Sequence, residues 1–103
     1  MFAVVTQKGP NWSHDRGIRE QPAWEAHAGF MDRLVERGAI VLGGPIEGEG
    51  DEVALLAVNA TDEEELRATF ADDPWAQSGI LSLKEVHAWT IWLDARRAQG
   101  QDC

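Results

Sequence analysis

Apolar positions along the chain form four runs that predict strands and two spaced patterns that predict helices. The runs cover residues 2–6, 39–42, 53–58 and 80–93, and the third run is apolar at every position. A strand without polar positions is typically buried on both faces. Helical spacing, with apolar side chains every three or four positions, covers residues 22–37 and 62–71. The predicted order of elements is therefore β-α-β-β-α-β.

Residues at the ends of the two predicted helices support these boundaries. Pro22 suits the first turn of the first helix, and Gly38 provides its stop. Thr61 is the expected N-cap of the second helix, and Glu64 completes a capping box three residues later. Pro74 disfavours helical backbone at the residue before it, so the second helix is expected to end there.

This order is that of the ferredoxin-like fold, an α+β fold with a four-stranded antiparallel sheet and both helices on one face. In the last strand, one face is expected to carry Leu81, Leu83, Trp89, Ile91 and Leu93, and the other Val86 and Ala88. Two helices cover only one face of a sheet, whereas the last three strands are apolar on both. We therefore expect a homodimer in which two sheets pack together around a shared core or barrel.

Composition narrows the class of protein and its partners. The 103 residues suit one domain, expected over residues 1–94, with a polar tail at 95–103. A net charge of -9 argues against binding to nucleic acid. The single cysteine, Cys103, leaves no internal disulfide and fits a reducing compartment. No signal peptide or apolar stretch of the roughly 20 residues needed to span a bilayer is seen, so we expect a cytoplasmic protein without a membrane partner.

One residue departs from the apolar stripe of the first predicted helix. His27 falls on the same face as Trp24, Met31 and Leu34, which turns it toward the sheet. A histidine in such a place can be a structural residue that is hydrogen-bonded in the core. It can also be a general base or acid, because imidazole titrates near neutral pH.

Asp73 is the second candidate for chemistry. An aspartate before a proline is common where a helix ends, and this alone explains its presence. In the predicted fold, however, the end of the second helix lies on the same face of the sheet as the first helix. Asp73, with Asp72 as the nearby alternative, is therefore placed to approach His27 and to fix its tautomer.

Aromatic and basic residues supply candidates for a binding site. The chain has five tryptophans and no tyrosine, which indicates core packing, dimer contact, or the wall of a pocket for a flat ligand. Trp12 lies in a long predicted loop at residues 7–20, and Trp75 follows the Asp-Pro pair; both are candidate substrate-binding residues. Arg19 is a candidate for binding an anionic group, and His87 can face the pocket or the dimer interior.

Motifs for cofactors and metals are not found in the sequence. The glycines at 43–44 lack the spacing and the lysine of a phosphate-binding loop. There is no cysteine cluster, and the three histidines are not paired at metal-ligand spacing. Ser13, His14 and Asp15 are adjacent in sequence, which is not evidence of a catalytic triad. We therefore expect neither a cofactor nor a metal ion.

Four segments together resemble the YciI-like (YCII-related) family: EQPAWEAHAGFMDRLVERG, IVLGGP, ADDPWAQSGI and VHAWTIW. The resemblance runs from the first strand to about residue 93. It implies a ferredoxin-like fold that forms a dimeric α/β barrel, with a cleft in which His27 and Asp73 carry acid–base catalysis. Gly44 and Pro45 match the family's glycine-proline turn. Trp75 stands where tyrosine is common, and His87-Ala88 replaces the usual basic-proline pair.

Two functional hypotheses follow, because the resemblance does not supply a reaction. The first is a small enzyme, an isomerase, lyase or hydrolase, in which His27 moves a proton on a small organic substrate and Asp73 orients it. The second is a non-catalytic dimeric ligand-binding or accessory protein that uses the same cleft without a titrating histidine.

Overall fold

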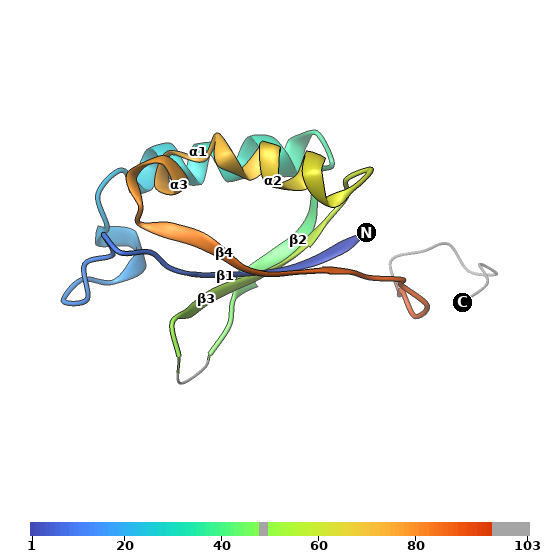
Figure 1. Ribbon diagram of the computed structural model, residues 1–103, viewed down its shortest axis with the longest axis horizontal. Helices are drawn as coiled ribbons and strands as arrows, with labels where there is room; N and C mark the ends of the chain where they lie inside the picture. Colours follow the sequence, from blue (N-terminus) through green and yellow to red (C-terminus); the bar gives the residue numbers. More distant parts are fainter. Residues whose placement is uncertain (48–49, 96–103) are drawn as a thin grey trace.

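A four-stranded antiparallel sheet is the base of the structure. The computed structural model describes residues 1–47 and 50–95. The strands are β1 (Phe2–Lys8), β2 (Ile40–Pro45), β3 (Glu52–Val58) and β4 (Leu81–Ala88), in the order β2-β3-β1-β4. Helices α1 (Trp24–Glu36), α2 (Glu63–Ala71) and α3 (Pro74–Ser78) lie on one face of the sheet (Figure 1). The predicted α+β, ferredoxin-like arrangement is confirmed.

The core lies between the helices and the sheet and is formed by two clusters. One cluster packs strands β1 to β3 against α1 and α2 and contains Val4, Leu34, Ile40, Leu56, Val58, Leu66 and Phe70. The other lies around α3 and contains Trp12, Val53, Trp75, Ile80 and Leu81. Trp12 is 8% exposed, so the long loop after β1 folds back onto the protein. The 3₁₀ helix η1 (Ile18–Glu20), which the sequence did not predict, lies within this loop.

Helix α1 begins two residues later than predicted. Ala23 is its N-cap and has a left-handed backbone with φ 61°, so Pro22 lies before the helix instead of in its first turn. The carbonyl oxygen of Pro22 accepts a hydrogen bond from the indole of Trp75 at 2.7 Å. At the other end, Gly38 has φ 80° and ends the helix as predicted.

The N-cap of helix α2 is Asp62, one residue after the predicted Thr61. The carboxylate of Asp62 accepts a hydrogen bond from the backbone N–H of Glu65 at 2.8 Å. Glu65 in turn accepts a hydrogen bond from the Thr61 hydroxyl at 2.7 Å. The predicted capping box of Thr61 and Glu64 is wrong, because the carboxylate of Asp62 is the side chain that reaches the first turn.

The segment that ends α2 also starts another helix, which the sequence did not predict. Pro74 is the first residue of α3, and Asp73 is its N-cap. The residues that stop one helix here, an aspartate and a proline, are also those that favour the start of a helix. Gly79, with φ 77°, ends α3 after only five residues. Because Asp73 is the N-cap of α3, the direction of its carboxylate is fixed by the start of that helix.

Strand β4 is shorter than predicted and contains a bulge. It ends at Ala88, so Trp89 and the apolar residues after it are not in the strand. Val5 pairs with Glu85 whereas Thr6 pairs with Leu83, so Lys84 is an extra residue. Leu83 and Val86 therefore both pack against the core under the helices. The predicted alternation, with Val86 on the opposite face from Leu83, is wrong for this reason.

The opposite face of the sheet is not covered by any helix in the described part of the chain (Figure 1). Leu55, on this face of β3, is 41% exposed. In the single chain, β3 is therefore buried on one face only, whereas the sequence predicted burial on both faces.

The predicted glycine-proline turn lies inside β2, because Gly44 and Pro45 pair with Leu55 and Ala54. Residues 96–103 of the predicted tail, with Cys103, lie outside the described residues.

Candidate functional site

His27 lies in the second turn of α1, on the side of the helix that faces the sheet. Its side chain is buried, with the residue 7% exposed, and its backbone N–H donates to the carbonyl of Ala23 at 3.0 Å. The helical spacing that placed it on the apolar stripe is therefore confirmed. Burying an imidazole costs free energy unless its polar atoms are hydrogen-bonded. The hydrogen-bond partner of the ring therefore determines its tautomer.

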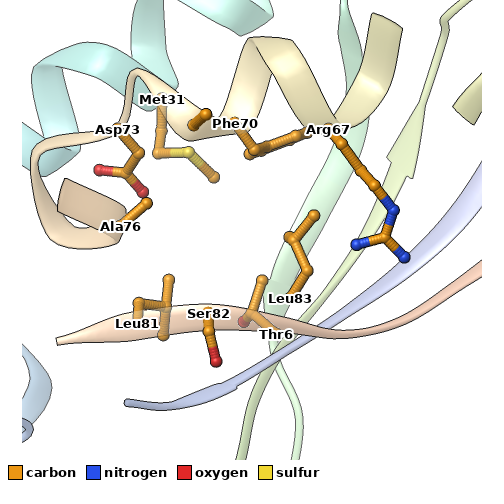
Figure 2. Close-up of a pocket in the computed structure, with 10 residues that line it drawn as sticks. Thr6, Met31, Arg67, Phe70, Asp73, Ala76, Leu81, Ser82 and Leu83 are labelled. Atoms are coloured by element: carbon orange, nitrogen blue, oxygen red, sulfur yellow. The ribbon is translucent and has the colours of Figure 1, made fainter. Parts of the chain in front are cut away.

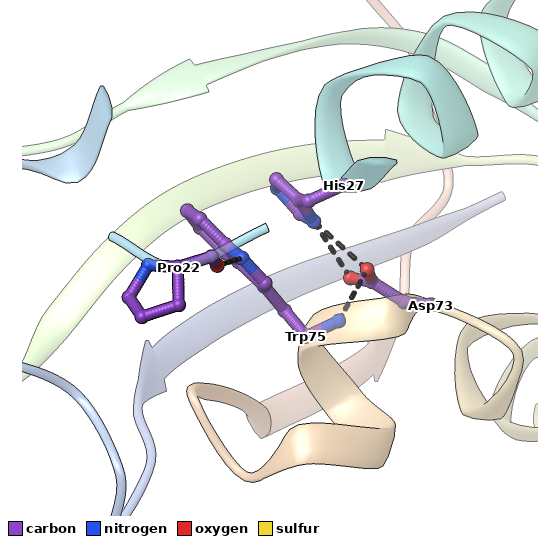
Figure 3. A network of polar contacts seen from close by, with 4 residues as sticks. All are labelled: Pro22, His27, Asp73 and Trp75. Atoms are coloured by element: carbon purple, nitrogen blue, oxygen red, sulfur yellow. Dashed lines mark hydrogen bonds and ion pairs between the residues drawn. The ribbon is translucent and has the colours of Figure 1, made fainter. Parts of the chain in front are cut away.

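That partner is Asp73. The Nδ1 atom of His27 is 2.9 Å from both carboxylate oxygens of Asp73, which is 3% exposed (Figure 3). The backbone N–H of Trp75 donates to the Oδ1 atom at 3.0 Å, as expected of an N-cap aspartate. The adjacent Asp72 is exposed. The structure therefore brings His27 together with Asp73 and leaves Asp72 outside this contact.

The contact determines the chemistry of the imidazole ring. An ionised carboxylate only accepts hydrogen bonds, so the Nδ1 atom of His27 carries the hydrogen that is donated to it. In the neutral ring the other nitrogen, Nε2, then carries the lone pair. Nε2 has no hydrogen-bond partner among the described residues. A histidine in this tautomer is ready to accept a proton from a ligand.

The cavity beside His27, which we call the front cavity, has a volume of about 540 Å³. It lies between α1, η1 and the strands β2 and β3. Its wall is largely apolar and includes Ile18, Trp24, His27, Met31, Ile40 and Leu56. Arg19 and Asp32 are the charged side chains in that wall. The volume lies in the range of sites that hold small organic molecules.

A loop hydrogen-bond network holds Arg19 near this cavity. Gln21 is 3% exposed, and its amide donates to the carbonyls of Ser13 and Arg16 at 2.8 and 3.1 Å. The backbone N–H of Ser13 donates to the Gln21 side-chain oxygen at 2.8 Å. These bonds fix the loop before η1, the element that carries Arg19. Gln21 was not predicted from the sequence, because a polar residue before Pro22 is not distinctive.

A second cavity, the rear cavity, lies on the other side of the His27–Asp73 pair. It has a volume of about 320 Å³ and lies between β4 and the helices α2 and α3. Figure 2 shows Asp73 and Arg67 at opposite ends of its wall, with Leu81 and Leu83 of β4 across from them. Asp73 lines this cavity, His27 lines the front one, and Met31 lines both. The pair therefore separates two spaces.

The other predicted binding residues lie apart from the front cavity wall. Trp12 and Trp75 are buried in the core, 8% and 0% exposed, and Trp75 stacks on His27. His87 is exposed on the open face of β4, where its Nε2 atom is 2.9 Å from Glu85. Of the predicted binding residues, Arg19 lines the cavity. Trp24 was not predicted as a wall residue, although its spacing of three from His27 places both on one helix face.

Residues 1–47 and 50–95 contain neither a metal-binding cluster nor a membrane-spanning helix. No group of three or more His, Cys, Asp or Glu side chains there is arranged to hold a metal ion. In the same residues, no helix is both long enough and apolar enough to cross a membrane.

Fold and site together define a small α+β protein with a buried histidine–aspartate pair beside an apolar cavity. The family model of the YCII-related domain matches residues 1–90, and the chain belongs to this family. A similar solved structure is 5-chloro-2-hydroxyhydroquinone dehydrochlorinase (TftG) from Burkholderia phenoliruptrix AC1100, in complex with 2,5-dihydroxybenzoquinone. It has a TM-score of 0.63 and 23% identity, covering 87% of this chain and 94% of that chain. This likeness shows a shared fold. No curated protein matches the chain.

Proposed function

We propose that the protein is an enzyme that moves a proton on a small organic substrate, with His27 as general base and then general acid. One observation carries this proposal: Nδ1 of His27 is 2.9 Å from both oxygens of the buried Asp73. This contact leaves Nε2 as the basic atom of a residue that lines the front cavity. A purely structural histidine does not require an adjacent cavity.

The proposed reaction begins with transfer of a proton from the substrate to Nε2 of His27. The electron pair of the broken C–H bond moves toward the adjacent carbonyl, which becomes an enolate. Asp73 stabilises the imidazolium that forms, because the carboxylate accepts the hydrogen bond from Nδ1. The imidazolium then returns its proton at a different carbon, which is an isomerisation. Alternatively the carbonyl re-forms, the enolate pair makes a new C=C bond, and a substituent on the next carbon leaves with the pair of its own bond. The imidazolium then gives its proton to the leaving group or to water, which completes an elimination.

The substrate class follows from the wall of the front cavity. Trp24 and the aliphatic side chains favour a small, apolar or aromatic body, and Arg19 favours an anionic oxygen on it. Arg19 therefore either binds a carboxylate or phenolate or stabilises the developing enolate. The dehydrochlorinase of similar fold is in complex with 2,5-dihydroxybenzoquinone, a flat ring with ionisable oxygens. This supports a substrate of the same general kind.

We propose in addition that the protein works as a homodimer in the cytoplasm. Exposed apolar side chains on the open side of the sheet, Leu42 and Leu55, favour a second copy packed against it. Trp89 and Leu93, just after β4, are 41% and 85% exposed and line a hollow together with Leu42, so they add to this apolar surface. A single cysteine in the sequence fits a reducing compartment.

The test compares the wild-type protein with His27→Gln. Binding of 2,5-dihydroxybenzoquinone is measured by calorimetry, and chloride release is measured from 5-chloro-2-hydroxyhydroquinone. Proton exchange of small cyclic ketones in D2O is followed by NMR, which detects proton abstraction without a leaving group. We expect His27→Gln to bind the quinone and to lower the rate by about 10²–10⁴-fold, the usual contribution of a general base.

His14→Gln is the matched control, because His14 is exposed in the loop before η1 and lines no part of the front cavity. It should keep the wild-type rate. Equal rates for wild type and His27→Gln would contradict the proposal. If wild type and His27→Gln both bind the quinone and neither reacts with any of these compounds, a ligand-binding module would be favoured instead.

A further inference from the structure

Trp75 is the largest fully buried side chain of the described residues, and it contacts both members of the histidine–aspartate pair. Its indole ring is stacked on the imidazole of His27, with centroids 3.9 Å apart and planes 4° from parallel. Its backbone N–H donates to the Oδ1 atom of Asp73 at 3.0 Å. Figure 3 shows Trp75 reaching from the start of α3 toward Pro22. One residue thus links three segments of the site.

The stack adds to what the hydrogen bond to Asp73 supplies. The bond to Asp73 holds one ring atom, Nδ1, but a contact at one edge of the ring still permits limited rotation about the Cβ–Cγ bond. A parallel indole face in van der Waals contact removes that rotation. The two contacts together determine where Nε2 points. The indole face also carries negative charge density, so it attracts the imidazolium that forms when His27 accepts a proton.

Trp75 itself cannot turn without breaking other contacts. Its Nε1 atom donates to the carbonyl oxygen of Pro22 at 2.7 Å, and the left-handed backbone of Ala23 sets the turn between that carbonyl and α1. Trp12 packs edge-on against the indole at 5.9 Å and 79°, and Trp24 lies at 5.7 Å. The position of the stacking face is therefore fixed from several sides.

We propose that Trp75 is a positioning residue that orients His27 for proton transfer and stabilises its protonated form; this inference rests on the proposed function of His27. From the sequence, Trp75 was a candidate substrate-binding residue in the wall of a pocket. In the structure it lines neither the front nor the rear cavity. Trp75 therefore acts on the rate of proton transfer and not on ligand affinity.

The test uses two replacements of Trp75. Trp75→Phe keeps an aromatic face but loses the N–H that binds Pro22, and Trp75→Leu removes the aromatic face. NMR of His27 gives two readouts: the ring-current shift of its carbon-bound protons and the fraction of ring with hydrogen on Nδ1. We expect Trp75→Leu to lose the ring-current shift and to show a mixture of tautomers. Trp75→Phe should retain most of both.

Steady-state kinetics give the functional readout. Loss of the cation–π stabilisation lowers kcat by about tenfold in Trp75→Leu, with KM within about twofold of wild type. Trp75→Phe should recover most of kcat. A rise in KM with unchanged kcat would overturn the inference, because it would make Trp75 a ligand-binding residue. Unchanged tautomer and kcat in Trp75→Leu would overturn it as well.

Leu66→Ala is the matched control, because it removes a fully buried side chain from the other core cluster, which contains neither His27 nor Trp75. It should lower the stability toward urea while leaving the His27 tautomer as in wild type. If Leu66→Ala changes the tautomer as much as Trp75→Leu, a general loosening of the core is the cause and the inference fails. The NMR readouts do not depend on turnover. If no reaction is found with any compound, the proposed function is refuted, but the ring-current shift and the tautomer still show whether Trp75 orients His27.

Discussion

The Nδ1 atom of His27 lies 2.9 Å from both carboxylate oxygens of Asp73, although the two residues are 46 positions apart in sequence. Each residue is fixed by its own helix: His27 by the second turn of α1, and Asp73 by its role as N-cap of α3. The contact therefore depends on how two helices are placed on the sheet. A change in either helix end is expected to alter the chemistry of the histidine.

Asp73→Asn is predicted to keep the fold and to impair catalysis. Asparagine is as good an N-cap as aspartate, so α3 keeps its cap and the unfolding midpoint in urea should change little. The amide, however, can donate to Nδ1 and so favours hydrogen on Nε2, the wrong tautomer. We expect kcat to fall by about 10²–10⁴-fold. Asp72→Asn, at the exposed neighbouring position, should retain wild-type kcat; equal losses in both variants would contradict this assignment.

Arg19→Gln is predicted to weaken the binding of anionic ligands. Arg19 lines the front cavity but is exposed, so water screens its charge and the loss should be only about three- to tenfold in Kd. Calorimetry with 2,5-dihydroxybenzoquinone and with an uncharged quinone of the same size measures the difference. Arg16→Gln, which changes an exposed arginine outside the front cavity wall, is the control. An equal loss for the charged and uncharged quinones would speak against Arg19 as an anion site.

Leu55→Asp is predicted to dissociate the proposed homodimer. Leu55 is 41% exposed on the open face of the sheet, where a charge would be buried against the second copy at a large cost. Light scattering after size exclusion should give the mass of a monomer. Ala68→Asp places the same charge at an exposed position of α2 and should remain a dimer. A wild-type protein that is already monomeric at micromolar concentration would refute the predicted dimer.

Asp62→Ala is predicted to lower the free energy of unfolding by about 1 kcal/mol, because it removes the N-cap of α2. Thr61→Ala should cost less, since the Thr61 hydroxyl contacts only the exposed side chain of Glu65. Urea denaturation followed by circular dichroism measures both. The reverse order would restore Thr61 as the cap that the sequence analysis predicted.

The ion pair between Glu52 and Lys84 predicts a pH dependence of stability. The Lys84 ammonium, 2.6 Å away, is the main cause of a pKa of Glu52 below its ordinary value of 4.5. A carboxylate with a lowered folded pKa stabilises the protein above the unfolded value, and this contribution is lost as pH falls through the folded pKa. In Lys84→Met, the urea midpoint should therefore be lower than in wild type at pH 7, and the gap should narrow as acid protonates Glu52. A gap that stays constant would contradict this linkage.

Much of the fold was predictable because it depends on local patterns. Apolar runs and helical spacing are visible in any single segment, and Gly38 marks a helix end through backbone freedom alone. The bulge at Lys84 was not predictable, because it is a property of the pairing between β1 and β4. Helix α3 was missed because an aspartate and a proline favour both the end of one helix and the start of another.

The site was predictable to a smaller extent. Helical spacing placed His27 toward the sheet, and the order of elements placed Asp73 on the same side. The stacking of Trp75 on His27 was beyond sequence reasoning, because it depends on the turn at Ala23 and on the short helix α3. His87 was expected near the pocket or the dimer interior, and its register opposite Ala3 places it on the open face of the sheet.

The proposed role of His27 requires that Nε2 carries the lone pair of the neutral ring on the side of the front cavity. Nitrogen-15 NMR of labelled histidine, recorded at neutral pH with and without 2,5-dihydroxybenzoquinone, is the sharpest measurement of this arrangement. We expect His27 to carry its hydrogen on Nδ1, and we expect the quinone to shift the Nε2 signal. Hydrogen on Nε2, with no response to the quinone in a protein that binds it, would rule out His27 as the base.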